Sequence, residues 1–114
     1  MTDLVTEATK ETFRDLVADG QVLVDVWGPD CQPCLAMMPH VERLAAESGG
    51  SLRVVKLEAP KARRLCMELK VMGLPAFLLF NDGAEVARIN GPQVSADALD
   101  TWLNENRTDD KESA

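Results

Sequence analysis

Short apolar runs alternate along the chain with segments whose apolar residues recur at helical spacing. Residues 22–27, 52–57 and 76–80 have the length and composition of buried strands. The third run is followed by an Asn-Asp-Gly turn at 81–83 and by another run at 85–89, which together predict a β-hairpin. The pattern also leaves room for an optional short strand before the first helix.

Four segments show the periodicity of an amphipathic helix. Their apolar faces are Phe13, Leu16 and Val17; Leu35, Met38, Val41 and Ala45; Ala62, Leu65, Cys66 and Leu69; and Leu99, Trp102 and Leu103. Thr9 and Ser95 are the expected N-caps of the first and last helices. The second helix is expected to begin near Cys34 and to be kinked by Pro39. This alternation of strands and helices predicts one α/β domain with helices on both faces of a sheet.

Length and charge limit the classes of protein to which this chain can belong. Its 114 residues are enough to bury a core; we expect one domain over residues 1–107 and a polar, frayed tail at 108–114. Twelve Lys and Arg against nineteen Asp and Glu give a net charge of −7, which argues against binding to nucleic acid or to an anionic membrane. No segment approaches the roughly 18 apolar residues of a membrane span, and the acidic N-terminus lacks the basic region of a signal peptide. We therefore expect a cytoplasmic protein.

Two closely spaced cysteines carry the clearest chemical signal. The segment Cys31-Gln32-Pro33-Cys34 follows a predicted strand and opens a predicted helix. The free amides and the positive dipole end of a helix N-terminus stabilise a thiolate, which is the form of cysteine that attacks disulfides. Pro33 suits the first helical turn, where a backbone donor is not required. In a reducing compartment, such a pair indicates catalysis or metal binding before a structural disulfide.

These motifs resemble the thioredoxin family, and the resemblance extends over nearly the whole chain. The segments that carry it are Val24-Asp25-Val26-Trp27, Cys31-x-Pro33-Cys34, Met38-Pro39, Val55-Lys56-Leu57, Gly73-Leu74-Pro75 and Asn81-Asp82-Gly83. The resemblance implies an α/β thioredoxin fold, with a central mixed sheet of five strands flanked by four helices. It also implies a protein-disulfide oxidoreductase that reduces disulfides in partner proteins and is re-reduced by a thioredoxin reductase or an equivalent electron donor. Such a protein needs no bound organic cofactor and no metal, and we expect it to act as a monomer.

The resemblance implies catalytic roles for three residues. Cys31 would be the attacking thiol, which forms a mixed disulfide with the substrate, and Cys34 the resolving thiol. Asp25 would be a buried carboxylate beneath Cys34, with Lys56 near it. Because burial raises the proton affinity of a carboxylate, Asp25 would accept the proton that Cys34 must lose. From the strand pattern alone, Asp25 fits an exposed sheet edge equally well, and Lys56 fits a charged strand end.

Four further positions match residues that surround the active site in the family. Trp27 would support the loop that carries the cysteines. Pro75 would be the cis-proline that faces the disulfide, beside a backbone edge at Leu74 that pairs with substrate. Gly91 matches, with a shift of one residue, a glycine that lets substrate approach.

Two residues beside the nucleophile depart from the family pattern. Asp30 stands where tryptophan is usual, and Gln32 where glycine is usual. At an effective dielectric constant of about 20, like charges a few ångströms apart repel by about one to a few kcal/mol, and by less when they are exposed. We therefore expect Asp30 to make the Cys31 thiolate harder to form and to disfavour acidic substrates.

Two other interpretations use the same residues. In the first, Cys31, Cys34, Cys66 and His40 form a Cys₃His zinc site. Against it, Cys66 falls on the apolar face of its predicted helix, where a free cysteine acts as a small buried hydrophobe. His40 lies six residues beyond Cys34 and is expected to be a solvated helix residue. In the second, the chain is a non-catalytic thioredoxin-fold adaptor that binds a partner's strand.

Overall fold

One mixed sheet organises the chain. The computed structural model describes residues 5–107, so the predicted fraying of the C-terminal tail lies outside the described residues. The strands are β1 (Val5–Ala8), β2 (Gln21–Trp27), β3 (Arg53–Glu58), β4 (Ala76–Asn81) and β5 (Ala84–Asn90). Their order in the sheet is β1-β3-β2-β4-β5. Strands β1, β3 and β2 are parallel, whereas β4 is antiparallel to β2 and β5 is antiparallel to β4. The optional N-terminal strand is present as β1.

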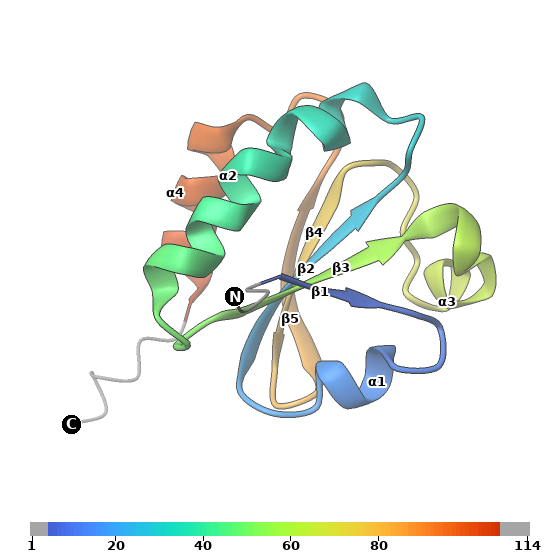
Figure 1. Ribbon diagram of the computed structural model, residues 1–114, viewed down its shortest axis with the longest axis horizontal. Helices are drawn as coiled ribbons and strands as arrows, with labels where there is room; N and C mark the ends of the chain where they lie inside the picture. Colours follow the sequence, from blue (N-terminus) through green and yellow to red (C-terminus); the bar gives the residue numbers. More distant parts are fainter. Residues whose placement is uncertain (1–4, 108–114) are drawn as a thin grey trace.

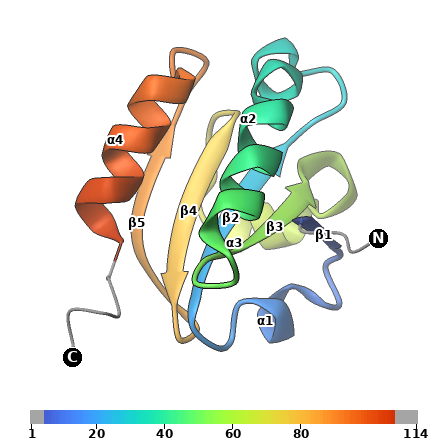
Figure 2. The ribbon, with the colours of Figure 1, turned by 60° about the vertical axis from the view of Figure 1, so that its left-hand side comes forward.

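Helices cover both faces of this sheet (Figure 1). Helices α2 (Gln32–Ser48) and α4 (Ala96–Asn106) lie on one face, and α4 runs beside β5 (Figure 2). Helices α1 (Phe13–Leu16) and α3 (Arg63–Glu68) lie on the other face, and the 3-10 turn η1 (Ala59–Lys61) leads into α3. The predicted mixed sheet of five strands flanked by four helices is therefore confirmed within the described part of the chain.

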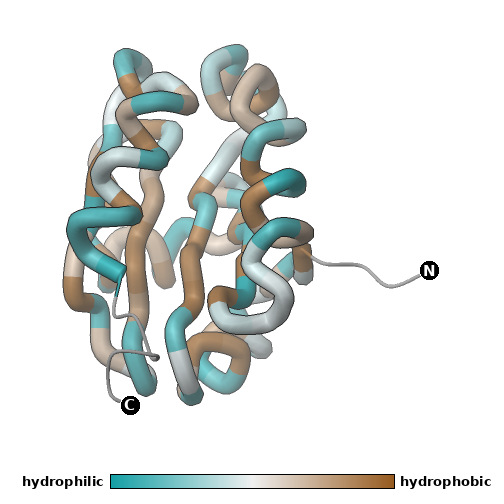
Figure 3. Tube along the Cα trace, turned by 90° about the vertical axis from the view of Figure 1, so that its left-hand side faces the viewer, coloured by the Kyte–Doolittle hydropathy of each residue, from teal (hydrophilic) through white to brown (hydrophobic). Residues whose placement is uncertain are grey.

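The sheet separates two apolar clusters. Strand residues on one face pack against α1 and α3, whereas those on the other pack against α2 and α4. In the central strand β2, Val22 and Val24 belong to the first cluster and Leu23 to the second. Both faces of β2 are thus buried, which is why it reads as a continuous apolar run. Figure 3, which looks onto the face covered by α2 and α4, accordingly shows hydrophobic positions along the strands behind these helices.

The buried face of α2 differs by one position from the predicted face. The helix begins at Gln32, with Cys31 as its N-cap, and its buried residues are Cys34, Met37, Val41 and Ala45. Leu35 is 38% exposed and Met38 is half-buried, so these two predictions were wrong. Cys34 occupies the first position of the buried stripe, where the apolar pattern predicts Leu35. Pro39 lies within α2 without ending it.

The other helices are close to their predicted places. The first is only one turn long, with Thr12 at its N-cap; Thr9 lies earlier, where its hydroxyl accepts hydrogen bonds from the amides of Glu11 and Thr12, each at 3.2 Å. Ser95 caps α4 as predicted, because its hydroxyl accepts from the amide of Ala98 at 3.1 Å. None of the helices in residues 5–107 is long and apolar enough to cross a membrane.

Strand β5 forms one edge of the sheet and holds the end of α3. The guanidinium of Arg88 donates to the backbone carbonyls of Leu69 at 2.7 Å and Lys70 at 2.9 Å. It also pairs with the carboxylate of Glu85. Cations stabilise the carbonyls at a helix C-terminus, so Arg88 fixes the point at which the chain leaves α3 for β4.

Candidate active site

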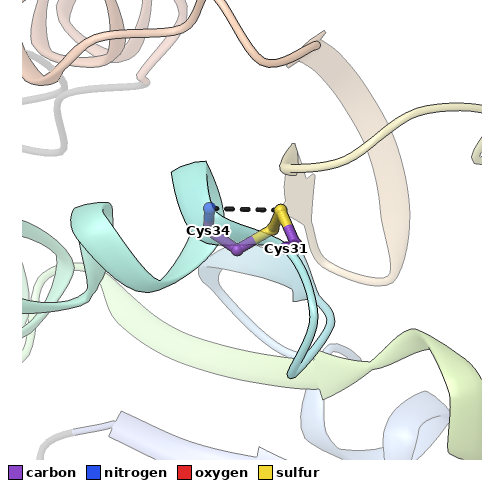
Figure 4. The surroundings of a disulfide bond; sticks show 2 residues. All are labelled: Cys31 and Cys34. Carbon is purple, nitrogen blue, oxygen red and sulfur yellow. Dashed lines mark hydrogen bonds between the residues drawn. A yellow bond between two sulfur atoms is a disulfide. The ribbon is translucent and has the colours of Figure 1, made fainter.

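The two cysteines of the motif are joined at the start of α2. Cys31 and Cys34 form a disulfide, with Cα atoms 5.2 Å apart. The backbone amide of Cys34 donates to the sulfur of Cys31 at 3.1 Å (Figure 4). Cys31 is half-buried, whereas Cys34 is 1% exposed. A helix N-terminus that donates to the more accessible sulfur favours a thiolate there when the disulfide is reduced.

Three segments distant in sequence meet beside this disulfide. Gly28 shows their proximity, because a Cβ atom placed on it would lie 3.4 Å from Leu74 Cδ1, 3.9 Å from Pro60 Cδ and 4.0 Å from Cys31 Cβ. These are ordinary van der Waals distances, so an alanine at this position would also fit. The loop after β3, which carries Pro60, was missed in the sequence because no pattern there indicates contact with the cysteines.

The segment before β4 and the end of β5 are joined at the predicted substrate edge. The Leu74–Pro75 peptide bond is cis. The amide of Gly91 donates to the carbonyl of Pro75 at 2.9 Å, so the structure brings these two predicted residues together. Gly91 has a φ of +114°, which favours glycine. The side-chain amide of Gln93 lies over Gly91 and donates to the carbonyl of Asn90; sequence reasoning did not identify it.

Asp25 is buried in the central strand. Its side chain is 1% exposed, so the alternative of an exposed sheet edge is excluded. Within residues 5–107, neither carboxylate oxygen has a hydrogen-bond partner. Desolvation by burial raises the pKa of Asp25 from 3.8 to about 7, while the nearby ammonium of Lys56 lowers this pKa and the carboxylate of Glu7 raises it. The carboxyl therefore exchanges its proton near neutral pH.

Lys56 and Trp27 contact the same acidic residue on β1. The ammonium of Lys56 lies 3.8 Å from Glu7 Oε1 and 5.5 Å from the centre of the Trp27 ring. The indole Nε1 of Trp27 donates to Glu7 Oε2 at 3.4 Å. Lys56 is thus part of a cluster rather than an isolated strand end. Glu7 was missed in the sequence because its neighbours are set by the pairing of β1 with β3, which a local pattern does not reveal.

The two departures from the family pattern face solvent on either side of the nucleophile. Asp30 and Gln32 are both exposed, whereas Pro33 is half-buried in the first turn of α2. Asp30 therefore places its charge at the surface next to Cys31, where water screens it.

The residues of the alternative zinc site are not assembled. Cys66 is buried in the cluster under α1 and α3, on the opposite face of the sheet from α2. Burial also raises the pKa of the Cys66 thiol. His40 is 15% exposed, and its Nε2 lies 2.7 Å from Asp100 Oδ1. The prediction of a solvated His40 was therefore wrong. No three His, Cys, Asp or Glu side chains of the described residues lie where they could hold a metal ion.

Comparisons with known proteins agree with this geometry. The family model named Thioredoxin matches residues 4–105. A thioredoxin of Acetoanaerobium sticklandii is 37% identical over 79% of this chain and 88% of its own length. A thioredoxin of Peptoclostridium acidaminophilum is 35% identical over 90% of this chain and 96% of its own length. The oxidized crystal structure of mitochondrial thioredoxin 3 from Saccharomyces cerevisiae superimposes with a TM-score of 0.79 at 26% identity, covering 89% of this chain and 94% of that one. The chain belongs to the thioredoxin family of thiol-disulfide oxidoreductases, with Cys31 and Cys34 as its redox pair.

Proposed function

We propose that Cys31 attacks disulfides in partner proteins and that Cys34 resolves the mixed disulfide. One observation carries this assignment: the more accessible sulfur, that of Cys31, accepts the hydrogen bond from the Cys34 amide at the N-terminus of α2. Cys34 is buried behind it. A thiolate is favoured where amides donate to it, and a buried thiol is shielded from reagents that arrive from solution. Cys31 is thus suited to attack a substrate from solution, and Cys34 is suited to attack only the mixed disulfide formed beside it.

The reaction exchanges one disulfide for another. The Cys31 thiolate attacks one sulfur of the substrate disulfide, so the bond between Cys31 and that sulfur forms as the substrate S–S bond breaks. The first substrate sulfur leaves as a thiolate and takes a proton from water. Cys34 then loses its proton and attacks the Cys31 sulfur, which forms the Cys31–Cys34 bond and releases the second substrate thiolate. The domain has lost two electrons and the substrate has gained them.

Asp25 accepts the proton that Cys34 loses before the second step. Its carboxyl lies in the strand that leads into the active-site loop, it is buried, and its pKa is raised to about 7 by that burial. General bases are most effective when their pKa lies near the working pH. A carboxyl with the ordinary value of 3.8 would be a much weaker base for a thiol.

The substrate strand lies along the segment before β4. Leu74 approaches the active-site loop at Gly28, and Pro75 and Gly91 are joined at the adjacent end of β5. An extended peptide gains affinity from main-chain hydrogen bonds to an exposed backbone edge. Pro33, in the first turn of α2, supports the active-site loop, as does Trp27 with its partners Glu7 and Lys56.

A separate reductase returns the domain to its dithiol form in the cytoplasm, where the domain acts as a monomer. A protein that reduces disulfides needs a reducing compartment. Whether its cysteine pair is oxidised or reduced depends on the reduction potential of the pair relative to that of the compartment. The family in general has disulfide substrates and a reductase partner. Asp30 and Gln32 border Cys31 at the surface and so meet the substrate first.

Trapping of the mixed disulfide tests the proposal. In Cys34→Ser, the resolving thiol is absent, so partner proteins from a lysate should remain bound to Cys31 through a disulfide that dithiothreitol releases. Cys31→Ser is the matched control and should capture nothing. Wild-type protein should reduce a model protein disulfide, and both variants should lose this activity. If Cys31→Ser captures partners as well as Cys34→Ser does, the assignment of Cys31 as the attacking thiol fails. If wild type reduces nothing, the proposed reduction of partner disulfides fails.

A further inference from the structure

Three charged residues lie in one row across neighbouring strands. In the register of the sheet, Lys56 on β3 lies opposite Glu7 on β1 and opposite Asp25 on β2. Paired residues of parallel strands project from the same face of the sheet. Asp25 neighbours Leu23 in the alternation of β2, and Leu23 packs under α2, the helix that carries both cysteines. One ammonium therefore stands between two carboxylates, one of which is the proposed base.

The ammonium contacts the carboxylate on the β1 side of the row. Lys56 Nζ lies 3.8 Å from Glu7 Oε1 and sits over the ring of Trp27. Trp27 in turn donates to the other oxygen of Glu7. Within the described chain, both oxygens of Asp25 lack a hydrogen-bond partner. Glu7 and Trp27 together thus fix the position of Lys56.

We propose that Glu7 is a positioning residue of the exchange reaction: it holds the Lys56 ammonium on the β1 side and so leaves Asp25 able to take up the Cys34 proton near neutral pH. The inference rests on the proposed role of Asp25 as proton acceptor. It concerns a residue that touches neither cysteine in the contacts described, and it acts through Lys56.

The physical reason is competition for one positive charge. An ammonium within about 4–6 Å of a carboxylate lowers its pKa by roughly 1–3 units. If Lys56 paired with Asp25, the carboxylate would stay ionised and would be a poor acceptor for the proton of a thiol. The carboxylate of Glu7 also raises the pKa of Asp25 directly, and Lys56 lowers it. Glu7 therefore raises the pKa of Asp25 in two ways: it holds the Lys56 ammonium, and it adds a negative charge nearby.

Other charged groups around the row do not replace Glu7. A cavity at the ends of β1 and β3 is lined by Glu7, Lys10, Glu11, Glu58 and Lys61, among others. Glu58 pairs with Lys61 at 3.6 Å. Lys10 and Glu11 are exposed. At the start of α2, Cys31 and Cys34 are joined in a disulfide and do not titrate in the oxidised protein. His40 lies farther along α2 against Asp100.

The direct test is the titration of Asp25 in Glu7→Gln. Glutamine keeps the size of the side chain and an acceptor for the Trp27 indole, but it releases the ammonium. Carbon-13 NMR of the Asp25 carboxyl should be recorded in the oxidised protein, where the cysteines do not titrate. We expect the midpoint to fall by about one pH unit. Glu11→Gln, which removes the same charge from the same cavity, should shift it by less than about a third as much.

A Lys56→Met background separates two effects of Glu7 on Asp25: the holding of the Lys56 ammonium and direct repulsion between the two carboxylates. In Lys56→Met there is no ammonium to release, so Glu7→Gln should then change the Asp25 midpoint by less than half of its effect in wild type. Glu7→Asp keeps a carboxylate and should restore part of the wild-type midpoint. An unchanged midpoint in Glu7→Gln overturns the inference, and so does an equal shift with and without Lys56, because Glu7 would then act by direct repulsion alone.

The kinetic test separates this inference from the proposed function. The rate of release of a preformed mixed disulfide is measured against pH in wild type, Glu7→Gln and Asp25→Asn. We expect the midpoint of the profile in Glu7→Gln to move to lower pH by the same amount as the Asp25 titration. If Asp25→Asn leaves release unchanged at every pH, the role of Asp25 itself fails. If Asp25→Asn slows release but Glu7→Gln leaves the profile in place, only the role of Glu7 fails.

Discussion

His40 on α2 and Asp100 on α4 are joined by a 2.7 Å contact between Nε2 and Oδ1, although 60 residues separate them in sequence. The guanidinium of Arg43 lies 3.3 Å from the other ring nitrogen. Because an arginine only donates, Nδ1 accepts from Arg43, and the hydrogen of the neutral ring lies on Nε2 and is donated to Asp100. The pair ties the helix that carries the cysteines to the C-terminal helix.

Loss of this tie should lower stability without stopping the chemistry. A partly buried hydrogen bond to a charged group contributes about 1.5–3 kcal/mol, and Asp100 is partly exposed, so His40→Ala should lower the free energy of unfolding by about 1–2 kcal/mol. Asp100→Asn, which keeps an acceptor, should lower it by less. Urea denaturation of the oxidised protein measures both. Equal stability of His40→Ala and wild type would contradict the structural role of the pair.

The buried carboxyl of Asp25 should make stability depend on pH. The folded pKa is about 7 and the ordinary value is 3.8, so between these values the folded chain holds a proton that the unfolded chain has released. Stability is therefore fully present below about pH 4 and falls as pH rises through 7, by on the order of 4 kcal/mol. Asp25→Asn should remove most of this fall. Unfolding free energies of both proteins at pH 5 and pH 8 provide the measurement, and parallel decreases in the two would contradict it.

Neutralising Asp30 should make Cys31 more reactive. Asp30 is exposed beside the nucleophile, so its repulsion of a thiolate is screened and should amount to no more than about 1 kcal/mol. In a Cys34→Ser background, Asp30→Asn should raise the rate of Cys31 alkylation by iodoacetamide at neutral pH about two- to fivefold. Glu105→Gln, an equal charge change on exposed α4, serves as the control. A rate for Asp30→Asn no higher than that of the control would refute the effect.

Alanine at Gly91 should impair both folding and substrate binding. Gly91 has a φ of +114°, where a side chain is strained by about 1–3 kcal/mol. Its new Cβ would also lie 2.5 Å from the Gln93 side-chain oxygen, which can rotate away at small cost. We expect Gly91→Ala to lose about 1–2 kcal/mol of stability and to raise KM for a protein disulfide more than it lowers kcat. Gly50→Ala is a fitting control, because Gly50 also has a positive φ, of 93°, but lies in the turn after α2.

Local patterns in the sequence predicted those parts of the molecule that depend on local chemistry. The apolar runs located β2, β3 and β4, and the spacing of Cys31 and Cys34 located the redox pair. The buried state of Asp25 could not be deduced in this way, since an acid in an apolar strand fits an edge as well as a centre. Its place in the sheet depends on β3 and β4 pairing on either side of β2.

Three of the contacts that were missed join residues far apart in the chain. Glu7 reaches Lys56 only because β1 pairs with β3, Pro60 reaches Gly28 through the convergence of loops, and His40 meets Asp100 across two helices. None of these contacts leaves a periodicity or a motif. The apolar pattern also places Met38 on the packed face of α2, whereas the buried residues of that helix are Cys34, Met37, Val41 and Ala45.

The anchoring of the segment between α3 and β4 has a practical consequence for redesign. Arg88 holds its beginning at Leu69 and Lys70, and the amide of Gly91 holds its end at Pro75. The first anchor lies on the edge strand β5 and the second directly after it, both outside the cysteine motif. If the proposed substrate edge holds, exchange of residues 71–74 between relatives should alter substrate preference while Arg88 and Gly91 keep the two attachment points fixed. Grafts that cut across either anchor would release the loop from the sheet, and the new sequence would no longer present its backbone to the thiol in a defined position.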